Sequence, residues 1–222
     1  MATFLFLKIK HLLWDSSVQA SPPLAMLEFG ITICQKKTVV WVANRDNPIN
    51  DTSGVLSINP HGNLVIHHNY TTFPIWSSNL SLSQSNTTNV IAQLSDIENL
   101  VLILNHTKTV IWQSFDHPTD TFLPNIRLGF DRRTNQSWSI QSWKTEDDPG
   151  TGEMSALNVS FVEDDNQIAL SFHLIDKSLI YSGIVQQPGF YQAFIWDNQK
   201  GQWISKIMIQ GTVPVGHTMI AV

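Results

Sequence analysis

Thr38-Val39-Val40-Trp41-Val42-Ala43-Asn44-Arg45-Asp46 is the stretch that decides the fold, because the chain returns to its pattern twice. The returns are Thr72–Asn79, which contains Trp76, and Lys108–Phe115, which contains Trp112. The three tryptophans are 35 and 36 residues apart, and each follows a β-branched residue at the end of an apolar run. A fixed period of this length indicates stacked or radially repeated units.

A second set of matches has the same period. Gly62–Ile66 lies 36 residues before Glu98–Leu102, and Asn69–Thr71 lies 36 residues before Asn105–Thr107. Each unit reads as a strand, an Asn-rich turn and a strand that ends in Trp. One hairpin cannot bury its apolar face alone. The pattern therefore predicts an all-β prism or barrel with approximate threefold symmetry, in which Trp41, Trp76 and Trp112 point inward as the core of the repeat.

The composition excludes several classes of protein. The 222 residues are 42% hydrophobic and only 14% charged, which is too little charge for a disordered chain. The net charge of −5, without a basic run, argues against nucleic acid as a partner. No run of about 18 apolar residues is present, so we expect no transmembrane helix. The one cysteine, Cys34, cannot form an intrachain disulfide.

Seven N-x-S/T sequons favour a protein of the secretory pathway, because this triplet accepts N-linked glycans there. Several of them fall in predicted turns, where a glycan can project into solvent. The alternative is that Asn, Ser and Thr are simply common in β-turns. The predicted glycosylation sites are Asn50, Asn69, Asn79, Asn86, Asn105, Asn135 and Asn158.

Three segments are predicted along the chain. Residues 1–23 read as a leader or disordered tail, because the apolar run Thr3–Leu7 is interrupted by Lys8–His11; Val18-Gln19-Ala20 would be the cleavage site of a weak signal peptide. The first repeat is then short, with its first strand over residues 27–33. Residues 24–127 form the repeat domain and residues 128–222 a second domain.

The second half is predicted to be β-rich as well. Alternating apolar residues indicate strands over residues 139–143, 168–175, 179–181, 191–196 and 202–209. Its aromatic residues are better explained as core than as a binding platform; they are Phe190, Tyr191, Phe194, Trp196 and Trp203.

The order and length of several motifs resemble the bulb-type lectin region of plant S-domain proteins, which are the S-locus glycoproteins and the G-type lectin S-receptor-like kinases. The resemblance covers residues 27–155 well and residues 156–210 loosely. The motifs that carry it are TVVWVANRDNPI, GNLVI with IWSSN, VIWQSFDHPTDTFLP, LGFDRRTN and SWKTEDDPGTGE.

The resemblance implies a bulb-lectin β-prism followed by part of an S-locus glycoprotein domain. Family members continue into EGF-like and PAN regions, and the kinases add a transmembrane helix and a kinase; this chain stops before all of them. The family's roles include recognition of pollen and defence signalling. These roles imply an extracellular or secreted location, with full-length members at the plasma membrane.

A sugar-binding row can be aligned in the second repeat. Mannose-binding bulb lectins, which this region resembles, carry Q-x-D-x-N-x-V-x-Y, whose alternate residues share one face of a strand. Planar Gln, Asp and Asn groups can hydrogen-bond adjacent sugar hydroxyls. The aligned residues are Asn59, His61, Asn63, Val65 and His67. His61 replaces the charged acceptor, so weak or absent mannose affinity is expected.

The same row in the third repeat reads Ser95, Ile97, Asn99, Val101 and Ile103. Two isoleucines cannot bond to hydroxyls, so this site is predicted to be inactive. The first repeat has no recognisable motif. A structural explanation is favoured in both repeats: the asparagines are turn residues and the valines are core.

No metal or cofactor is predicted. His61, His67 and His68 are close in sequence, and the first two could share a strand face. A metal site would also need convergent ligands with supporting contacts, and neither a carboxylate nor a cysteine accompanies these histidines.

No catalytic residue is predicted. Ser114, Asp116 and His117 could suggest a nucleophilic triad, but nothing marks an activated nucleophile. Asp46 and Asp120 could suggest a glycosidase pair, yet both lie in turn-rich segments where Asp caps turns. The chain is therefore expected not to be an enzyme.

The sequence thus predicts an extracellular recognition module for a mannose-type glycan or a protein ligand, with degenerate mannose sites. The alternative is a protein–protein scaffold, or a truncated decoy of a receptor-like kinase, that pairs with an S-domain receptor and binds no sugar.

Overall fold

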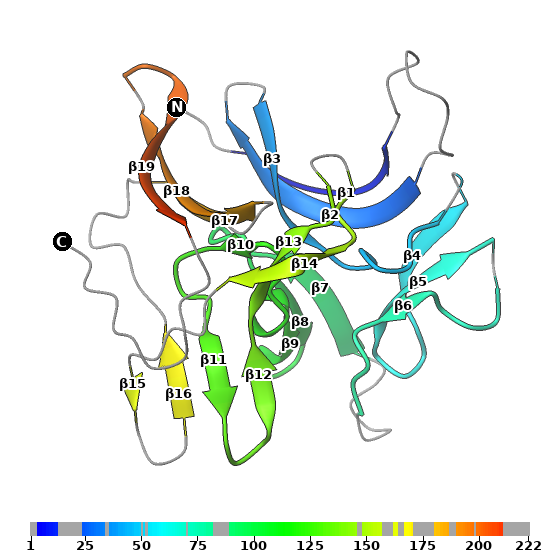
Figure 1. Cartoon of the computed structure of the whole chain (residues 1–222). Helices are drawn as coiled ribbons and strands as arrows, with labels where there is room; N and C mark the ends of the chain where they lie inside the picture. Colours follow the sequence, from blue (N-terminus) through cyan, green and yellow to red (C-terminus); the bar gives the residue numbers. More distant parts are fainter. Residues whose placement is uncertain are drawn as a thin grey trace. The chain divides into compact units, whose positions relative to one another are not determined.

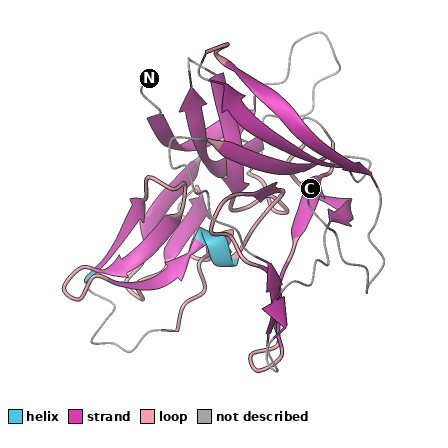
Figure 2. Cartoon of the chain, turned by 90° about the vertical axis from the view of Figure 1, so that its left-hand side faces the viewer, coloured by secondary structure: helices cyan, strands magenta, loops and turns pink. Residues whose placement is uncertain are grey.

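The computed structural model describes residues 4–12, 24–33, 36–49, 51, 53–69, 71–81, 89–145, 148–156, 162–163, 167–170, 180–186, 190–197 and 199–210. Within these ranges the chain is all-β, without an α-helix; Figure 2 shows mostly strands, with the short 3-10 helix η2 (Ser114–Asp116) in cyan. It separates into two compact units, residues 2–114 and, with Met1, residues 115–222. Each unit is described by itself.

The first unit contains three antiparallel sheets of three strands each, one for each predicted repeat (Figure 1). The first sheet is β1 (Phe4–Leu12), β2 (Leu24–Ile33) and β3 (Lys36–Val42). The second is β4 (Gly54–Ile58), β5 (Leu64–His68) and β6 (Trp76–Ser77). The third is β7 (Val90–Leu94), β8 (Leu100–Leu104) and β9 (Thr109–Gln113).

The three repeat tryptophans meet in the middle of this unit. The ring centroids of Trp41, Trp76 and Trp112 are 5.9–6.0 Å apart, and the three interplanar angles are 74–77°. Edge-to-face packing of this kind is a preferred geometry for aromatic pairs. The predicted inward core is confirmed, because Trp41 and Trp112 are buried and Trp76 packs against Ile49 and Ile66.

Each tryptophan holds the same position in its sheet. Trp41, Trp76 and Trp112 pair with Phe29, Ile66 and Leu102 respectively. In the first and third sheets the register shifts by one residue just before the tryptophan, at Val40 and Ile111. Such a bulge bends the strand and re-aims the side chain that follows.

Of the two alternatives predicted for residues 1–23, a leader or a disordered tail, the second is wrong for Phe4–Leu12, because these residues form strand β1. It pairs with β2 continuously, from Phe4 opposite Thr32 to Leu12 opposite Leu24. The physical reason is that β2 has backbone groups to satisfy on both sides, and β3 covers only one of them. With β1 in place the first repeat has three strands, like the other two. A signal-peptide function for residues 1–23 stays a prediction.

The second unit contains three further antiparallel sheets. Their strand orders are β10-β17-β18-β19, β12-β11-β16-β15 and β13-β14. The strands are β10 (Thr121–Phe122), β11 (Leu128–Asp131), β12 (Gln136–Trp138), β13 (Ile140–Trp143), β14 (Thr151–Ala156), β15 (Val162–Glu163), β16 (Gln167–Leu170), β17 (Tyr181–Gln186), β18 (Phe190–Asp197) and β19 (Gln202–Gln210).

The strands predicted over residues 139–143, 191–196 and 202–209 are confirmed as β13, β18 and β19, whereas the strand predicted over residues 179–181 overlaps β17 only at Tyr181. The predicted core role is confirmed for two of the aromatic residues, while Phe190, Phe194 and Trp203 are half-buried. Tyr191 and Trp196 are buried, and Trp196 stacks edge-to-face on Trp203 with centroids 5.5 Å apart. Tyr191 lies against Gly183, at a position where a Cβ would clash with its ring. The Tyr181 and Tyr191 hydroxyls hydrogen-bond over 2.6 Å, and burial raises the pKa of both phenols.

Candidate functional site

The predicted sugar row of the second repeat is built around Asn63, which is buried. Its side-chain oxygen accepts a hydrogen bond from Ser78 Oγ (3.0 Å) and another from the backbone N–H of Leu80. Its Nδ2 donates to the carbonyl of Leu80 over 3.1 Å. Ser78 Oγ also accepts from the backbone N–H of Leu64 (3.1 Å). The amide therefore holds residues 78–80 against the start of β5.

The third repeat contains the same arrangement. Ser114 Oγ donates to Asn99 Oδ1 over 3.1 Å and accepts from the Leu100 N–H over 3.0 Å. Asn99 Nδ2 donates to Gln113 Oε1 over 2.9 Å. We call the pairs Asn63–Ser78 and Asn99–Ser114 the Asn–Ser locks. Each joins the turn before the middle strand to the residue just after the third strand.

The first repeat cannot form this lock. The lock asparagine lies three positions before the residue that pairs with the repeat tryptophan. This position holds Asn63 in the second repeat and Asn99 in the third, but Met26 in the first. The lock serine lies two positions after the repeat tryptophan. This position holds Ser78 in the second repeat and Ser114 in the third, but Ala43 in the first. The register thus explains why no motif is recognisable there: an apolar residue stands at each of the two positions that form the lock.

The remaining residues of the second-repeat row differ in how accessible their side chains are to a ligand. Asn59 Oδ1 accepts from the backbone N–H groups of His61 (2.9 Å) and Asn63 (3.0 Å), so it caps the turn. Val65 is fully buried, whereas His61 is exposed. His67 Nδ1 donates to the Thr71 carbonyl over 2.7 Å, which places its proton on that nitrogen. The row therefore offers a ligand mainly the exposed ring of His61.

The third-repeat row presents apolar groups instead. Ile97, in the turn, is 49% exposed, and Val110 on the neighbouring strand is 50% exposed. Glu98 lies in the same turn with φ +60°. Burial, and secondarily the charge of Asp96, raises the pKa of Glu98 to about 7.

Among the residues that resemble catalytic sites, Ser114 has a structural role. Ser114 is buried and its hydroxyl belongs to a lock. Asp120 is buried, whereas Asp46 is exposed in a turn. Among the described residues, no three His, Cys, Asp or Glu side chains converge as metal ligands. His68 instead contacts Asp51 over 3.1 Å on the surface.

Four predicted glycosylation sites lie in the described residues, and all four are exposed: Asn69, Asn79, Asn105 and Asn135. Three of these asparagines have left-handed backbone geometry, with φ of 51°, 54° and 57° at Asn69, Asn79 and Asn135. Asn is tolerated there better than most residues. Asn50, Asn86 and Asn158 lie outside the described residues, as does Cys34.

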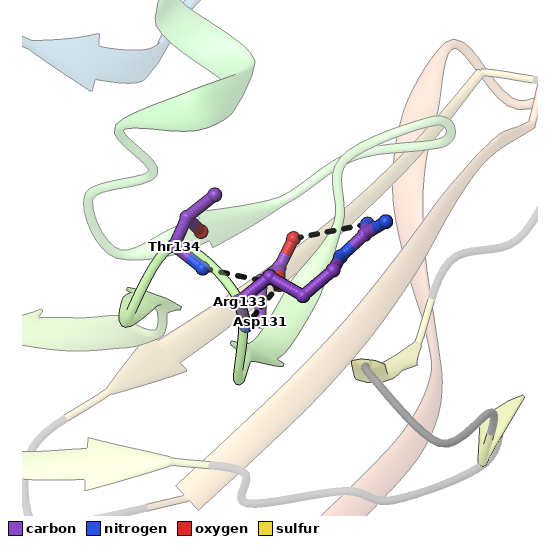
Figure 3. Close-up of polar contacts among 3 residues, drawn as sticks. All are labelled: Asp131, Arg133 and Thr134. Carbon is purple, nitrogen blue, oxygen red and sulfur yellow. Dashed lines mark hydrogen bonds and ion pairs between the residues drawn. The ribbon is translucent and has the colours of Figure 1, made fainter.

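The turn that carries Asn135 is fixed by a buried carboxylate (Figure 3). Asp131 accepts hydrogen bonds from the backbone N–H groups of Arg133 (2.8 Å) and Thr134 (3.4 Å). The Arg133 guanidinium lies 3.5 Å from its second oxygen. The carboxylate therefore organises the β11–β12 hairpin, which presents the sequon at its tip.

Comparison with known proteins adds three findings. Residues 38–144 match the family described as D-mannose binding lectin. The G-type lectin S-receptor-like serine/threonine-protein kinase RKS1 of Arabidopsis thaliana is 34% identical over 76% of this chain and 25% of its own length. The S-locus-specific glycoprotein S6 of Brassica oleracea is 28% identical over 75% of this chain and 48% of its own length. The chain thus spans a quarter to a half of these relatives.

Three sheets arranged around a tryptophan triad, with a lectin family match over their motifs, define an all-β protein of the lectin class. More narrowly, the chain belongs to the plant S-domain family of G-type lectin S-receptor-like kinases and S-locus glycoproteins. No helix in the described part of the chain is long and apolar enough to cross a membrane. The predicted domain boundary at residue 127 falls between the division at residue 114 and the end of the family match at 144, and it stays a prediction.

Sequence reasoning missed the two lock serines. The signal was present, because Ser78 and Ser114 are 36 residues apart, the same spacing as Asn63 and Asn99. A polar residue that follows a strand is unremarkable by itself. Only its contact with the repeat asparagine shows that it is structural.

Proposed function

We propose that this chain is a non-enzymatic, extracellular recognition module of the S-domain lectin family with degenerate mannose sites. By family it is linked to pollen recognition or defence signalling. The observation that best supports degenerate sites is that the polar side chains of the row bond within the protein. The side-chain oxygens of Asn59 and Asn63 accept hydrogen bonds from backbone N–H groups, and Asn63 also accepts one from Ser78. A sugar hydroxyl would have to displace these bonds.

The exposed position of His61 allows a direct test, since a change there leaves the lock intact. His61→Asp restores the charged acceptor of the bulb-lectin motif, and His67→Tyr can be added to it. His106→Asp, a change at an exposed histidine in the third repeat, is the matched control. Binding of each variant is measured on a glycan array and by calorimetric titration with methyl mannoside.

We expect the wild-type chain, His106→Asp and His61→Asp all to show no mannose binding at about millimolar affinity, because the oxygens of Asn59 and Asn63 remain engaged in internal hydrogen bonds. A gain of binding in His61→Asp would show that the missing charged acceptor, and not these internal bonds, is what makes the site degenerate. Millimolar-or-better wild-type affinity that His61→Ala abolishes would sink the proposal of degenerate sites. Wild-type binding to another glycan on the array would support sugar recognition through a different surface.

A protein–protein scaffold is the second candidate function. The exposed side chain of Ile97 favours it, since this residue stands where the sugar row would need a polar group. A folded chain that binds nothing on the glycan array would shift the assignment to this candidate, in which the chain serves as a scaffold or a truncated decoy that meets an S-domain receptor.

A further inference from the structure

The hairpin of β11 and β12 places an exposed aromatic ring beside a glycosylation sequon (Figure 1). Phe130 on β11 pairs with Ser137 on β12, and Ser137 is the third residue of the sequon that begins at Asn135. Directly paired residues present their side chains on the same face of a sheet, with Cβ atoms about 5 Å apart. Asn135 stands two residues before Ser137 and is therefore a diagonal neighbour of Phe130. A diagonal neighbour lies about 7–8 Å away, which is within reach of an aromatic side chain.

The burial of this hairpin puts the ring and the sequon on its solvent side. Phe130 is 36% exposed, and Asn135 and Ser137 are exposed as well. Asp131 follows Phe130 on the strand and thus belongs to the opposite face, where it is buried. Its carboxylate accepts the backbone N–H groups of the turn (Figure 3). The buried side of the hairpin is thus occupied by the carboxylate, and the Phe130 ring remains on the open side.

The side chain of Asn135 is available for modification. Its backbone has left-handed geometry with φ of 57°, and its amide forms no hydrogen bond with another described residue. By contrast, the side-chain oxygen of Asn105 accepts a hydrogen bond from Lys108 Nζ over 2.8 Å. In the described part of the chain β12 pairs only with β11, so the strand that carries the sequon is open along one side.

The first sugar of an N-linked glycan has a surface that suits an aromatic ring. The glycan comes from a lipid diphosphate donor: the bond from Asn Nδ2 to C1 of the sugar forms, the bond from C1 to the diphosphate breaks, and Nδ2 loses one proton. This first sugar is a β-linked N-acetylglucosamine, whose ring substituents are all equatorial, so its faces carry C–H groups. The face of a phenyl ring is electron-rich and attracts such groups, and stacking removes apolar surface of both rings from water.

We propose that the first N-acetylglucosamine of a glycan at Asn135 stacks on Phe130, and that this contact stabilises the β11–β12 hairpin. The inference rests on the extracellular location in the proposed function, because the sugar is added in the secretory pathway. The glycan at this sequon is then part of the fold, whereas glycans at the other sequons only cover the surface.

The sequon of Asn79 provides a matched control. It also ends in serine, its asparagine is exposed, and the φ of 54° at Asn79 is close to the 57° at Asn135. The strand before it pairs through Trp76 and Ser77 with Ile66 and Val65, so no exposed aromatic residue lies opposite. A sugar on Asn79 therefore has the same backbone setting without a ring to stack on.

Nuclear magnetic resonance of the full chain tests the contact directly. The protein is made in a plant secretory pathway, and its glycans are trimmed by an endoglycosidase that leaves only the first N-acetylglucosamine. The signals of the sugar on Asn135 are identified by their loss in Ser137→Ala. We expect them to shift upfield through the ring current and to show nuclear Overhauser contacts with the Phe130 ring. In Phe130→Leu, which keeps an apolar side chain, they should move to the positions of the Asn79 sugar.

Hydrogen exchange of the β11–β12 backbone N–H groups tests the stabilisation, because a hairpin can open locally. Loss of the glycan in Ser137→Ala should speed this exchange about fivefold, which corresponds to about 1 kcal/mol. In Phe130→Leu, and in protein made without glycans, Ser137→Ala should change the exchange by less than about twofold. Ser81→Ala, which removes the Asn79 glycan, should leave it unchanged.

The proposal is overturned by an occupied Asn135 whose sugar shows neither the upfield shift nor the contacts with the ring. An equal effect of Ser137→Ala with and without the Phe130 ring would overturn it as well, and so would an Asn135 without glycan. These failures leave the proposed function intact when other sequons carry glycans. Absence of glycan from every sequon would in addition count against the extracellular location, and the glycan-array result is independent of all of these outcomes.

Discussion

Ser78 Oγ donates to Asn63 Oδ1 over 3.0 Å, and Ser114 Oγ repeats this contact with Asn99 Oδ1 over 3.1 Å. The two locks are 36 residues apart and close their sheets in the same way. A residue type associated with sugar recognition in bulb lectins is here committed to the fold. This has a direct experimental consequence, because removal of Asn63 would change stability before it could report on a ligand.

We expect Asn63→Ala to lower the free energy of unfolding by about 2–3 kcal/mol, because it leaves the Leu80 N–H and the buried Ser78 hydroxyl without their acceptor. Ser78→Ala should cost about 1–2 kcal/mol. In the double variant the two losses should be less than additive by more than about 0.5 kcal/mol. Urea denaturation measures all three values. Ser57→Ala, at an exposed position on β4, is the control and should stay within about 0.5 kcal/mol of the wild type. Strictly additive losses would show that the pair is not coupled.

The tryptophan triad should dominate the stability of the first unit. Trp112→Ala should cost about 3–5 kcal/mol through lost burial and the cavity left behind. Each edge-to-face contact adds about 0.5–1.5 kcal/mol, and each ring makes two of them. Phe73→Ala is the control, since Phe73 is 82% exposed. Thermal unfolding followed by tryptophan fluorescence measures the change, and equal midpoints for the two variants would contradict the central role of the triad.

Glu98 should make stability depend on pH. Burial, and secondarily Asp96, raises its pKa from 4.5 to about 7 in the folded chain. The folded state therefore binds more protons than the unfolded state between about pH 4.5 and 7, and stability falls as pH rises through this window. The loss is about 1–3 kcal/mol, reduced by the partial exposure of the side chain. In Glu98→Gln this part of the pH dependence should vanish. Parallel curves for the two proteins would refute the raised pKa.

Removal of residues 1–23 should expose one whole side of β2. The nine paired residues of β1 would be lost. The unpaired N–H and C=O groups of β2 would then form a sheet edge that can pair with other chains. We expect the chain of residues 24–222 to unfold at a lower urea concentration and to elute from size exclusion partly as aggregate. If instead it matches the full chain in both measurements, Phe4–Leu12 is dispensable and the leader function gains support.

When the chain is made in a plant secretory pathway, we expect N-linked glycans at the four sequons that are exposed in the structure, which are those of Asn69, Asn79, Asn105 and Asn135. Asn69, Asn79 and Asn135 are exposed and have left-handed backbone geometry, so their side chains are accessible to the transferase. Peptide mass spectrometry before and after endoglycosidase treatment measures the occupancy. Absence of glycan from all four sites would argue against passage through that pathway.

The second and third sheets could be predicted from the sequence because three tryptophans and two Asn-containing turns share one period. Strand β1 could not, since Lys8 and Lys10 interrupt its apolar run and its partner strand begins only at Leu24. An apolar run with basic residues suggests a leader as readily as a strand. The lock serines were equally hidden, because their role depends on contacts across the sheet rather than on local pattern.

The sugar row was only partly predictable for a similar reason. The sequence could place its positions on one period, but the alignment could not show that the side-chain oxygens of Asn59 and Asn63 accept hydrogen bonds from the backbone.

The angles within the tryptophan triad also limit how the protein can change in evolution. All three pairs of rings are close to perpendicular. Space admits only three mutually perpendicular planes, so a fourth indole could not join the cluster on equal terms. Duplication of one more hairpin would thus break the arrangement rather than extend it. A fourth repeat would therefore have no equivalent place at the triad, and we expect added length to be tolerated best in the loops between strands.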